Sequence, residues 1–557
     1  MAFSGALVRA PLTQSVTDLN DYLGPSQVCI KPVEAPQASE APSGEVRRPL
    51  TQTEIAIDQG TYYESGGQRA RTQLETAQIS LNDCLACSGC VTSAETVLIG
   101  MQSIDEVKRE LAAPQDRTFV ASISPQSLAS LVVRYAHAHP SSSKEAPLTQ
   151  AALLRRITAA LQQRGFHIVH DTSFARHLAL REHQREFRER RKARQDGTKD
   201  APRLPMLASA CPGWICYAEK AHSELLPYIA ATKSPQQVSG VLAKRWLGPA
   251  LREAPVYHVA VMPCYDKKLE ASRAQFEQDG VKEVDCVLTT GELHDLLLET
   301  NFDPYAPVPG EADTPAWPEL LQEPGSSSGG YLFAILHTVW DEWVAAHPGA
   351  APTLELRVIR SVDYTDYVLR SPEGETVFKG AQCYGFRNLQ NLVRKIQRET
   401  GARSARRAAR GRMVRRGAED DAPYDYVEVM ACPGGCVNGG GQMRPPADAV
   451  APAMPTEDHA QGWQGTDKKW VQRVEDAYWI DTGRRAAPDA LAAPDAQAAG
   501  PLRVLHAAAS GELHAWLAHV DASAAEVEAR LALRETHALR TTYQGVAPQT
   551  NGLAVQW

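Results

Sequence analysis

The chain has 557 residues, 43% of them hydrophobic and 22% charged, and a formal net charge of -8 at pH 7. This length allows about two to four domains with more than one buried core, and the composition is that of an ordinary globular protein rather than a disordered or fibrous one. The negative charge argues against nonspecific nucleic-acid binding, and no stretch reaches the length of a transmembrane helix. We therefore expect neither a nucleic acid nor a membrane as a partner.

The cysteines indicate metal chemistry in a reducing compartment. Eleven in a chain of this length are too few for a disulfide scaffold, and several have CxxC spacing. The apolar stretch Phe3 to Val8 is too short for a secretory signal. We therefore expect a cytoplasmic protein, and the sequence leaves a nuclear pool open.

Three N-terminal cysteines have the spacing of cluster ligands. Cys84, Cys87 and Cys90 form a CxxCxxC motif, and Gly89 eases the turn between them. Three thiolates at this spacing can wrap one iron-sulfur cubane, as in ferredoxins, while a zinc site is the alternative.

The fourth ligand of this site must come from elsewhere in the chain. Bacterial ferredoxins continue with a further cysteine, but Ala94 stands at that position here. Cys29 is the candidate, because it precedes the trio, lies close to Pro32 and has no other evident task. The alternative is a core thiol at Cys29 with solvent or a different side chain as the fourth ligand. The polar, proline-rich stretch from Pro32 to Pro49 is typical of a loop or linker.

From Arg117 the pattern becomes an alternation of strands and helices, which predicts parallel strands joined by right-handed crossovers. The predicted elements of a first lobe are a strand, turn and helix over 117–131, a helix over 148–165 closed by Gly165, and strands over 166–174 and 205–210.

A second lobe is predicted from Val256 onward. Its elements are strands over 256–263 and 354–361, a strand passing into a helix over 284–299, an apolar stretch over 374–386, a helix over 388–397 and a strand over 424–431. The segment 301–330 is rich in Pro, Gly and Ser and predicts a loop.

Two charged runs interrupt the lobes. The mixed run 182–203 either continues a helix into solvent, forms a solvated insert or contacts an acidic partner. The more basic run 400–423 has no interleaved aromatic residue to stack on a base, so it favours a surface insert over a nucleic-acid site. Near the C-terminus, 486–500 is typical of a disordered segment, and 502–520 and 525–543 predict helices.

Four further cysteines follow predicted strands. Cys211 and Cys264 each end one strand, and Cys432 and Cys436 lie in a glycine-rich turn after another. Ligands gather at the carboxyl ends of strands in open α/β sheets, so these four thiols are predicted to converge. They form the ligand set of a [4Fe-4S] cluster or a structural zinc, and ordinary buried thiols are the remaining alternative. The other cysteines, at Cys216, Cys286 and Cys383, lack ligand spacing and are predicted to be core thiols.

The segments SACPGW, VMPCYDKK and EVMACPGGCVNGGGQ resemble the three H-cluster signatures of iron-only hydrogenases. The whole chain is more similar to the hydrogenase-like cytosolic iron-sulfur assembly factors of eukaryotes, also called prelamin A recognition factor-like proteins. The resemblance implies a two-lobed α/β fold with parallel sheets, an N-terminal ferredoxin-like cluster segment and a helical, small-subunit-like C-terminal region. The expected boundaries are an N-terminal iron-sulfur segment over 1–115, lobes over 116–254 and 255–445, and a linker, helices and docking tail over 446–557.

The resemblance also implies two [4Fe-4S] clusters, one on Cys29, Cys84, Cys87 and Cys90 and one on Cys211, Cys264, Cys432 and Cys436. The implied function is cytosolic iron-sulfur cluster assembly, bridging upstream scaffold proteins and a late targeting complex to mature cytosolic and nuclear apoproteins. The C-terminal Trp557 is the implied anchor on a WD-repeat protein of that complex, although a frayed, exposed end is the alternative.

Hydrogenase activity is not expected. In hydrogenases a cysteine precedes the first cluster ligand and relays protons, whereas Ala210 stands there in this chain and cannot exchange a proton. Lys267 and Met430 match residues around the hydrogenase diiron site, and a lysine at the crevice rim is the alternative for Lys267. A hydrogenase or related redox enzyme and a lamin-tail interaction protein are the other candidate functions. A hydrogen-evolution assay and pull-downs with and without iron separate them from assembly work.

Overall fold

The computed structural model describes residues 54–58, 61–65, 72–74, 101–114, 116–138, 148–198, 202–251, 254–278, 280–311, 318–321, 323–400, 422–446, 466–480, 511–533 and 537–545. Cys29, Cys84, Cys87, Cys90 and Trp557 lie outside these residues, as do nearly all of the basic run 400–423 and the whole of 486–500. The chain divides into two compact units, one of residues 1–93, 452–465 and 548–557 and the other of 94–451 and 466–547. The described part of the first is an antiparallel sheet of β1 (Glu54–Asp58), β2 (Thr61–Ser65) and β3 (Thr72–Leu74).

The larger unit contains a first sheet that is parallel throughout. Its strand order is β10-β7-β4-β5, with β4 at Thr118–Ile123, β5 at Ile168–Asp171, β7 at Val256–Met262 and β10 at Cys286–Thr289. Nearly every residue of β4, β7 and β10 is buried. A parallel sheet covered on both faces produces such apolar runs, and the predicted strands and their parallel pairing are confirmed here.

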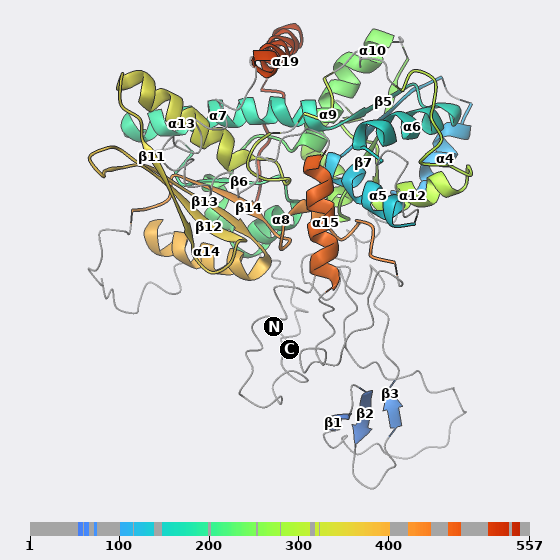
Figure 1. Cartoon of the computed structure of the whole chain (residues 1–557), viewed down its shortest axis with the longest axis horizontal. Coiled ribbons are helices and arrows are strands. Elements are labelled where there is room, and N and C mark those ends of the chain that lie inside the picture. The colour runs from blue at the N-terminus through green and yellow to red at the C-terminus, as the bar shows by residue number, and fades with distance from the viewer. Residues whose placement is uncertain are drawn as a thin grey trace. The chain divides into compact units, whose positions relative to one another are not determined.

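The second sheet of this unit is mixed (Figure 1). Its order is β11-β12-β13-β14-β6, with β11 at Thr353–Val358, β12 at Tyr364–Arg370, β13 at Thr376–Tyr384, β14 at Tyr426–Met430 and β6 at Met206–Ala208. The pairs β13-β14 and β14-β6 are parallel, and β11-β12 and β12-β13 are antiparallel.

The two sheets do not follow the predicted lobe boundary between residues 254 and 255. Strand β6 comes from the first predicted lobe but joins the second sheet, while β7 and β10 come from the second predicted lobe and join the first sheet. The local hydrophobic pattern identifies a strand but does not specify its partner, because pairing depends on backbone hydrogen bonds made across the sheet.

Helices cover both sheets, and their ends follow local sequence signals. Helix α6 begins after Thr149, whose side chain accepts a hydrogen bond from the Ala152 N–H, and Gly165 with φ of 107° follows its end. The α-helices are α4 (Ile104–Ala112), α5 (Pro125–Ala138), α6 (Gln150–Gln163), α7 (Ser173–Gln195), α8 (Pro212–Ala221), α9 (Pro235–Leu242), α10 (Gly248–Leu251), α11 (Asp266–Ala271), α12 (Thr290–Leu298), α13 (Tyr331–Ala346), α14 (Phe386–Thr400), α15 (Thr466–Ile480) and α19 (Gly511–Arg530).

Short elements complete the unit. They are the 3-10 turns η1 (Ser223–Tyr228), η3 (Ala274–Phe276) and η4 (Cys436–Asn438), the π-helical turn η2 (Ala243–Leu247) and the small hairpin of β8 (Glu277–Gln278) and β9 (Val281–Lys282). Within the described residues of 301–330 there is no helix or strand, in agreement with the predicted loop. No helix of the described residues combines the length and apolar character that crossing a bilayer requires.

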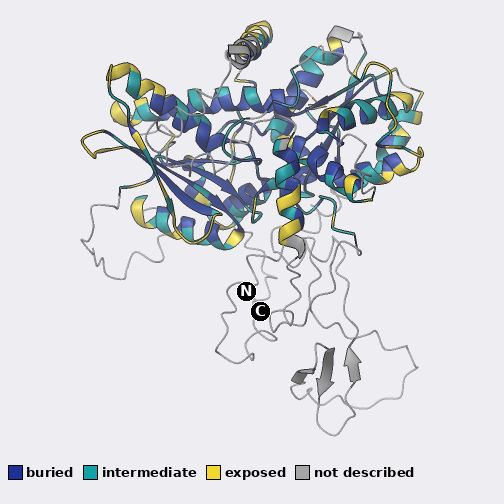
Figure 2. Ribbon diagram, viewed as in Figure 1, coloured by how far each residue is buried: buried dark blue, intermediate teal, exposed yellow. Residues whose placement is uncertain are grey.

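Two large apolar cores lie on the two sheets, and Figure 2 shows buried residues concentrated along them. One core contains β6, β13 and β14 with α13 and α14, and the other contains β4, β7 and β10 with α5, α6 and α15. The first core also contains residues of β12. Three elements of the two cores, α13, β12 and α15, were not predicted from the sequence. The helix α19 spans the junction between the two predicted C-terminal helices.

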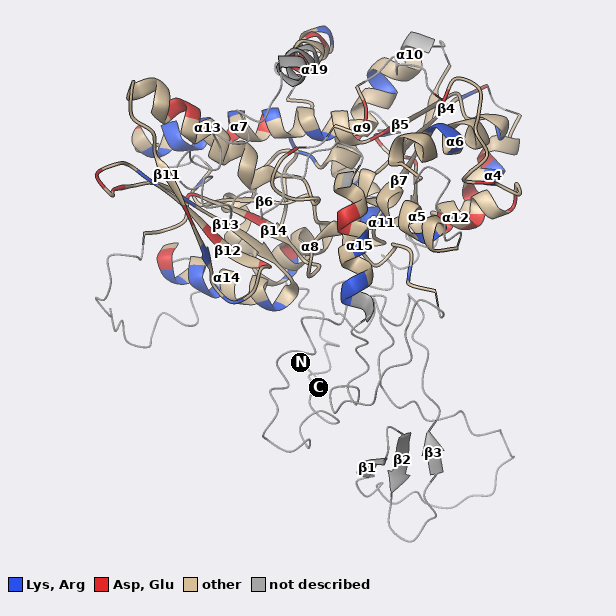
Figure 3. Cartoon of the chain, in the orientation of Figure 1, with Lys and Arg blue, Asp and Glu red and all other residues tan. Residues whose placement is uncertain are grey.

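The mixed-charge run 182–203 continues α7, along which basic and acidic residues alternate (Figure 3). The helix does not simply run into solvent, because Glu186 and Arg190 are both almost completely buried and form an ion pair of 2.6 Å. Arg190 also donates to the backbone carbonyl of Ile229, and Glu186 accepts from the Ala231 N–H. These bonds connect α7 to the segment that follows β6.

A further link joins α7 to α19. The ring nitrogens of His177 lie 2.8 Å from Glu323 Oε1 and 3.1 Å from Asp521 Oδ1. Burial alone lowers the pKa of His177, but its hydrogen bonds to Asp521 and Glu323 outweigh that effect and raise the pKa to about 9. The protonated histidine therefore joins two carboxylates from different parts of the chain.

We predict that this link weakens at alkaline pH. The pKa of His177 in the folded state lies above the ordinary histidine value of about 6.5, so the stabilisation is fully present below pH 6.5 and is lost as the pH rises through about 9. The stability difference between the native chain and His177→Gln should be on the order of 1–3 kcal/mol at pH 6 and near zero at pH 10. Thermal unfolding across this range measures it, and a difference that does not change with pH contradicts the assignment.

Candidate functional site

Two of the candidate ligands follow neighbouring strands of the second sheet. Cys211 comes three residues after the end of β6, and Cys432 comes two residues after the end of β14. The two strands are parallel, with Ala208 opposite Glu428, so both chains leave the sheet at the same edge. The Ser209 hydroxyl donates to the Val429 carbonyl and accepts from the Cys211 N–H, which fixes the first cysteine beside β14.

The third cysteine arrives from the other sheet. Cys264 follows β7, and the glycine-rich turn that carries Cys436 contacts the same segment, since the Gly441 N–H donates to the Pro263 carbonyl at 2.9 Å. A Cβ on Gly439 would overlap that carbonyl oxygen, so the backbones meet only because glycine has no side chain. The turn therefore brings Cys436 toward the cysteine at the end of β7.

The structure brings all four thiols into electrostatic contact. Burial raises the pKa of Cys264 well above its ordinary value, and Asp266 and the other three cysteines raise it further. Burial likewise raises the pKa of Cys432, with added contributions from Cys211 and Cys436. Burial and the nearby Cys211 raise the pKa of Cys436 to about 12. The predicted convergence of Cys211, Cys264, Cys432 and Cys436 is thus present in the fold.

Hydrogen-bond donors reach two of the four sulfur atoms. The backbone N–H groups of Ala431 and Trp214 donate to the Cys211 thiol and oppose the effect of burial on its pKa. Ser328, from the loop before α13, accepts from the Cys436 N–H at 2.8 Å, and its hydroxyl also interacts with the Cys436 thiol. Donors of this kind stabilise sulfur that carries negative charge.

The donor set fits an iron-sulfur cluster. Cys211 is buried and the other three cysteines are half-buried, and the raised pKa of each thiol opposes deprotonation. A positively charged metal centre removes that resistance because thiolates are its ligands. No three His, Cys, Asp or Glu side chains in the described ranges are spaced as ligands of a single metal ion.

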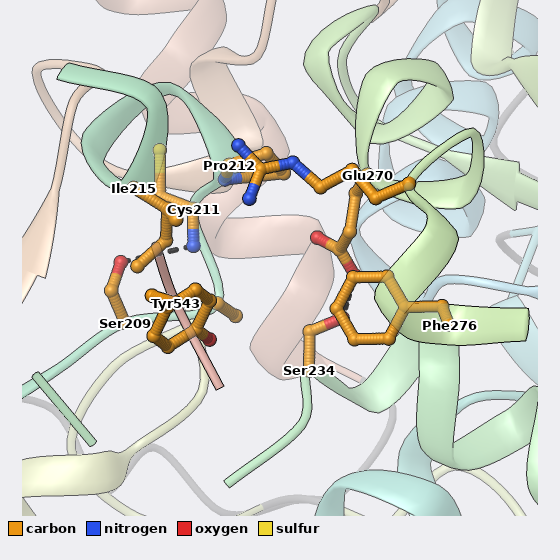
Figure 4. Close-up of a pocket in the computed structure, with 10 residues that line it drawn as sticks. Ser209, Cys211, Pro212, Ile215, Ser234, Glu270, Phe276 and Tyr543 are labelled. Carbon is orange, nitrogen blue, oxygen red and sulfur yellow. Dashed lines mark hydrogen bonds between the residues drawn. The ribbon is translucent and has the colours of Figure 1, made fainter. Parts of the chain in front are cut away.

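A small pocket opens beside Cys211 (Figure 4). Ser209, Cys211 and Pro212 line one side, Ser234 and Glu270 another, and Tyr543 approaches from the C-terminal segment, with Ala210, Ile215, Arg273 and Phe276 completing the lining. Its only sulfur atom among these residues is that of Cys211. The methyl group of Ala210 adds no proton donor to it.

Lys267 is buried, so the alternative of a lysine at the crevice rim is wrong. Its ammonium lies 2.8 Å from Glu270 Oε2 and 3.0 Å from Ser234 Oγ, and Ser234 also bonds the second oxygen of Glu270. The three side chains form a closed network within the protein at one wall of the pocket.

Comparisons with known proteins agree with this geometry. The family model for the iron-only hydrogenase large subunit, C-terminal domain, matches residues 129–440. The cytosolic Fe-S cluster assembly factor NAR1 of Mycosarcoma maydis is 43% identical over 86% of this chain and 84% of its own length. The cytosolic Fe-S cluster assembly factor narfl of Xenopus tropicalis is 38% identical over 100% of this chain and 99% of its own length. The chain belongs to the family of cytosolic iron-sulfur cluster assembly factors.

Solved structures show which fold this assembly-factor family member has. An FeFe-hydrogenase studied for its inactivation by oxygen covers 72% of this chain and 95% of its own, with a TM-score of 0.51 and 24% identity. An FeFe-hydrogenase variant from Chlamydomonas reinhardtii covers 79% and 98%, with a TM-score of 0.51 and 23% identity. The predicted hydrogenase-like α/β fold is therefore confirmed.

The remaining described cysteines of this assembly-factor family member are core thiols, as predicted. Cys216, Cys286 and Cys383 are free, buried thiols on α8, β10 and β13. Cys216 accepts from the Arg273 guanidinium at 3.2 Å, and burial raises its pKa to about 11. These three are core thiols.

Sequence analysis missed two residues of the site. Asp266, immediately before Lys267, is half-buried and raises the pKa of Cys211, Cys264 and Cys432. Ser328 reaches Cys436 from the loop 301–330, where the run of three serines followed by two glycines was the available signal. Ser328 and Cys436 are 108 positions apart in the sequence, so local patterns could not predict their contact.

We predict that Gly439→Ala disrupts this site selectively. The added methyl group would overlap the Pro263 carbonyl and push the Cys436 turn away from Cys264. An overpacked contact costs about 1–3 kcal/mol, so iron held by these cysteines should be lost to a chelator about tenfold faster than in the native chain.

Gly291→Ala is the matched control. This glycine touches the same turn, but a Cβ there would meet nothing closer than 4.0 Å. Chelation kinetics followed by absorbance compare the two variants, and equal iron loss from Gly439→Ala and the native chain argues against the close approach as a requirement of the site.

Proposed function

We propose that this chain is a component of cytosolic iron-sulfur cluster assembly that holds two [4Fe-4S] clusters and matures cytosolic and nuclear iron-sulfur proteins. The observation that carries the proposal is the convergence of four cysteines: adjacent parallel strands carry Cys211 and Cys432 to one sheet edge, and the turn with Cys436 bonds to the segment before Cys264. The names of the relatives, cytosolic assembly factors in fungi and vertebrates, support the same function and a cytoplasmic location.

Cys211, Cys264, Cys432 and Cys436 would hold the first cluster. The N–H groups of Ala431 and Trp214 stabilise charge on Cys211, and the Gly439 turn keeps Cys436 close to Cys264. Such a cluster would supply either a structural cross-link between the sheets or a group for transfer. In either role the protein residues hold the sulfur ligands in place and shield them from water.

Cys29, Cys84, Cys87 and Cys90 would hold the second cluster. The support is the CxxCxxC spacing of the last three and the resemblance to the assembly factors, which adds Cys29 as the fourth ligand.

We infer that the chain is not a hydrogenase, although it shares that fold. Ala210 offers no proton to a group bound beside Cys211, and Lys267 is already paired with Glu270 and Ser234. Lys267, Ser234 and Glu270 thus form hydrogen bonds with one another at this pocket. The names of the relatives as assembly factors agree with a role that changes no covalent bond.

The chain would act as a bridge between partners. Upstream scaffold proteins would supply clusters, apo iron-sulfur proteins would receive them, and Trp557 would dock on a WD-repeat protein of the targeting complex. An aromatic residue at a chain end suits this task because it supplies a large apolar anchor from a short tail.

The two-cluster proposal predicts an iron count. After anaerobic reconstitution the native chain should bind about eight irons, and Cys29→Ala and Cys436→Ala should each bind about four, because each variant removes one ligand of one cubane. Iron and sulfide analysis with Mössbauer spectroscopy measures this.

Cys383→Ala is the control for that count, because Cys383 is a buried core thiol on β13 and should leave about eight irons in place. Zinc in either site, or loss of all iron from both ligand variants, contradicts two independent clusters.

The docking proposal predicts a separable defect. Deleting Trp557 should weaken binding to the WD-repeat partner by about 2 kcal/mol or more, roughly thirtyfold, while the iron content stays at the native value. Calorimetric titration of the loaded chain with the partner measures the affinity, and iron analysis of the same sample measures the iron content. Unchanged affinity would show that the tail is an ordinary frayed end.

A further inference from the structure

The outermost strand of the second sheet is unprotected in the described structure. Strand β11, at one end of the order β11-β12-β13-β14-β6, pairs only with β12 among the described strands (Figure 1). Its six residues, from Thr353 to Val358, keep an unbroken register and contain no proline, lysine or bulge. Prolines, lysines and bulges are features by which proteins usually prevent an edge strand from pairing with another chain.

The free backbone groups of this edge can be assigned by residue. The Ile359 N–H donates to the Tyr364 carbonyl, so odd-numbered residues of β11 direct their backbone groups toward β12. Hydrogen-bonding direction alternates along an antiparallel strand, and Leu354, Leu356 and Val358 therefore direct their N–H and C=O groups outward. Three consecutive outward positions form a template for a further strand.

Apolar side chains accompany these backbone groups. Leu354, Leu356 and Val358 share one face of the strand, and the fraction exposed reaches 40% for Leu356 and 63% for Val358. Ile359, 50% exposed, and Val362, 79% exposed, follow in the turn to β12. Figure 2 shows exposed residues along this end of the sheet. An apolar face beside an open strand edge is typical of an interaction site.

The charges of the strand select a particular partner. Glu355 and Arg357 flank Leu356 on the opposite face and form an ion pair of 2.7 Å within the chain, and Glu355 also accepts from Arg370 of β12 at 3.0 Å. When β11 is placed antiparallel to a second β11 with Leu356 at the centre, Glu355 lies opposite Arg357, and Leu354 lies opposite Val358. The strand is therefore complementary to itself.

Other registers that use the outward backbone groups are less favourable. A shift that centres the pair on Glu355 places that carboxylate opposite its own copy, and a shift that centres it on Arg357 opposes two guanidinium groups. Like charges directly opposite each other destabilise an antiparallel pair. The register centred on Leu356 is the one that joins opposite charges and pairs all six outward backbone positions.

We propose that two copies of this chain associate through β11, antiparallel and centred on Leu356, so that their second sheets become one continuous sheet. The two-fold arrangement is closed, because each copy uses the same edge once. A strand pair of this length is a small interface, so we expect a dimerisation Kd on the order of 1–100 µM.

Charge reversal tests the proposal directly. Glu355→Arg and Arg357→Glu each place like charges opposite one another twice in the homodimer. Either variant should raise the dimerisation Kd by about fivefold to thirtyfold, from the cross-strand energies of two symmetric pairs. Sedimentation equilibrium of the iron-loaded full chain measures the Kd.

Mixing the two variants provides the decisive result. In a heterodimer, the introduced Arg faces the introduced Glu and the native Glu355 faces the native Arg357, so a 1:1 mixture should regain the native Kd. Recovery also shows that both variants are folded. Leu356→Pro should abolish association, because it removes the outward N–H at the centre without removing a bond to β12. Val281→Ser, at an exposed position on the distant strand β9, should leave the Kd unchanged.

Three outcomes overturn the proposal. The native chain remains a monomer at about 200 µM, which is above the expected Kd range. Alternatively, it forms a dimer that neither charge reversal weakens, which places the interface elsewhere. In the third outcome, the mixture does not recover, which excludes this register and leaves the edge to another segment or to a different protein.

Discussion

The repulsion that four neighbouring cysteines would experience as thiolates is the constraint on which the candidate site depends. The pKa of Cys264 is raised by burial, which removes screening water, and further by the charges of Asp266 and of the other three cysteines. A fold that gathers these groups without a cation would be destabilised wherever they ionise. A bound cluster would turn the same arrangement into a cross-link, because each thiolate would then have a metal partner. The proposed cluster would therefore link metal binding to the mutual position of the two sheets.

The surrounding backbone makes this gathering feasible. Strands β6 and β14 are adjacent and parallel, so Cys211 and Cys432 leave one sheet together, and the glycine turn touches the segment after β7 to bring the other two thiols near. Ser328 supports Cys436 from a loop that has no helix or strand in its described residues. The chain thus has the fold of FeFe-hydrogenases, with Ala210 beside Cys211 in the pocket and Lys267 paired with Glu270.

Much of the site was predictable because its signals are local. A strand followed by cysteine and proline, or by a glycine-rich turn, specifies where each thiol leaves its sheet, and those positions for Cys211, Cys264 and Cys432 agree with the structure. The assignment of β6 to the second sheet was not predictable, since pairing of Met206–Ala208 with Tyr426–Glu428 joins segments more than two hundred residues apart. Helix α13 was missed because its almost uniformly apolar sequence lacks a clear helical period. Asp266 lies two residues after Cys264 in sequence, but only the fold shows that its charge acts on Cys211 as well as on Cys264.

The most direct test is diffraction from anaerobically grown crystals of the iron-loaded chain, with data collected on both sides of the iron absorption edge. We predict an anomalous iron peak of one cubane, with Cys211, Cys264, Cys432 and Cys436 each bonded to a different iron at about 2.3 Å, a typical metal-thiolate distance. A peak that belongs to zinc, or a fully loaded protein in which any of these four thiols stands away from the metal, would contradict the account.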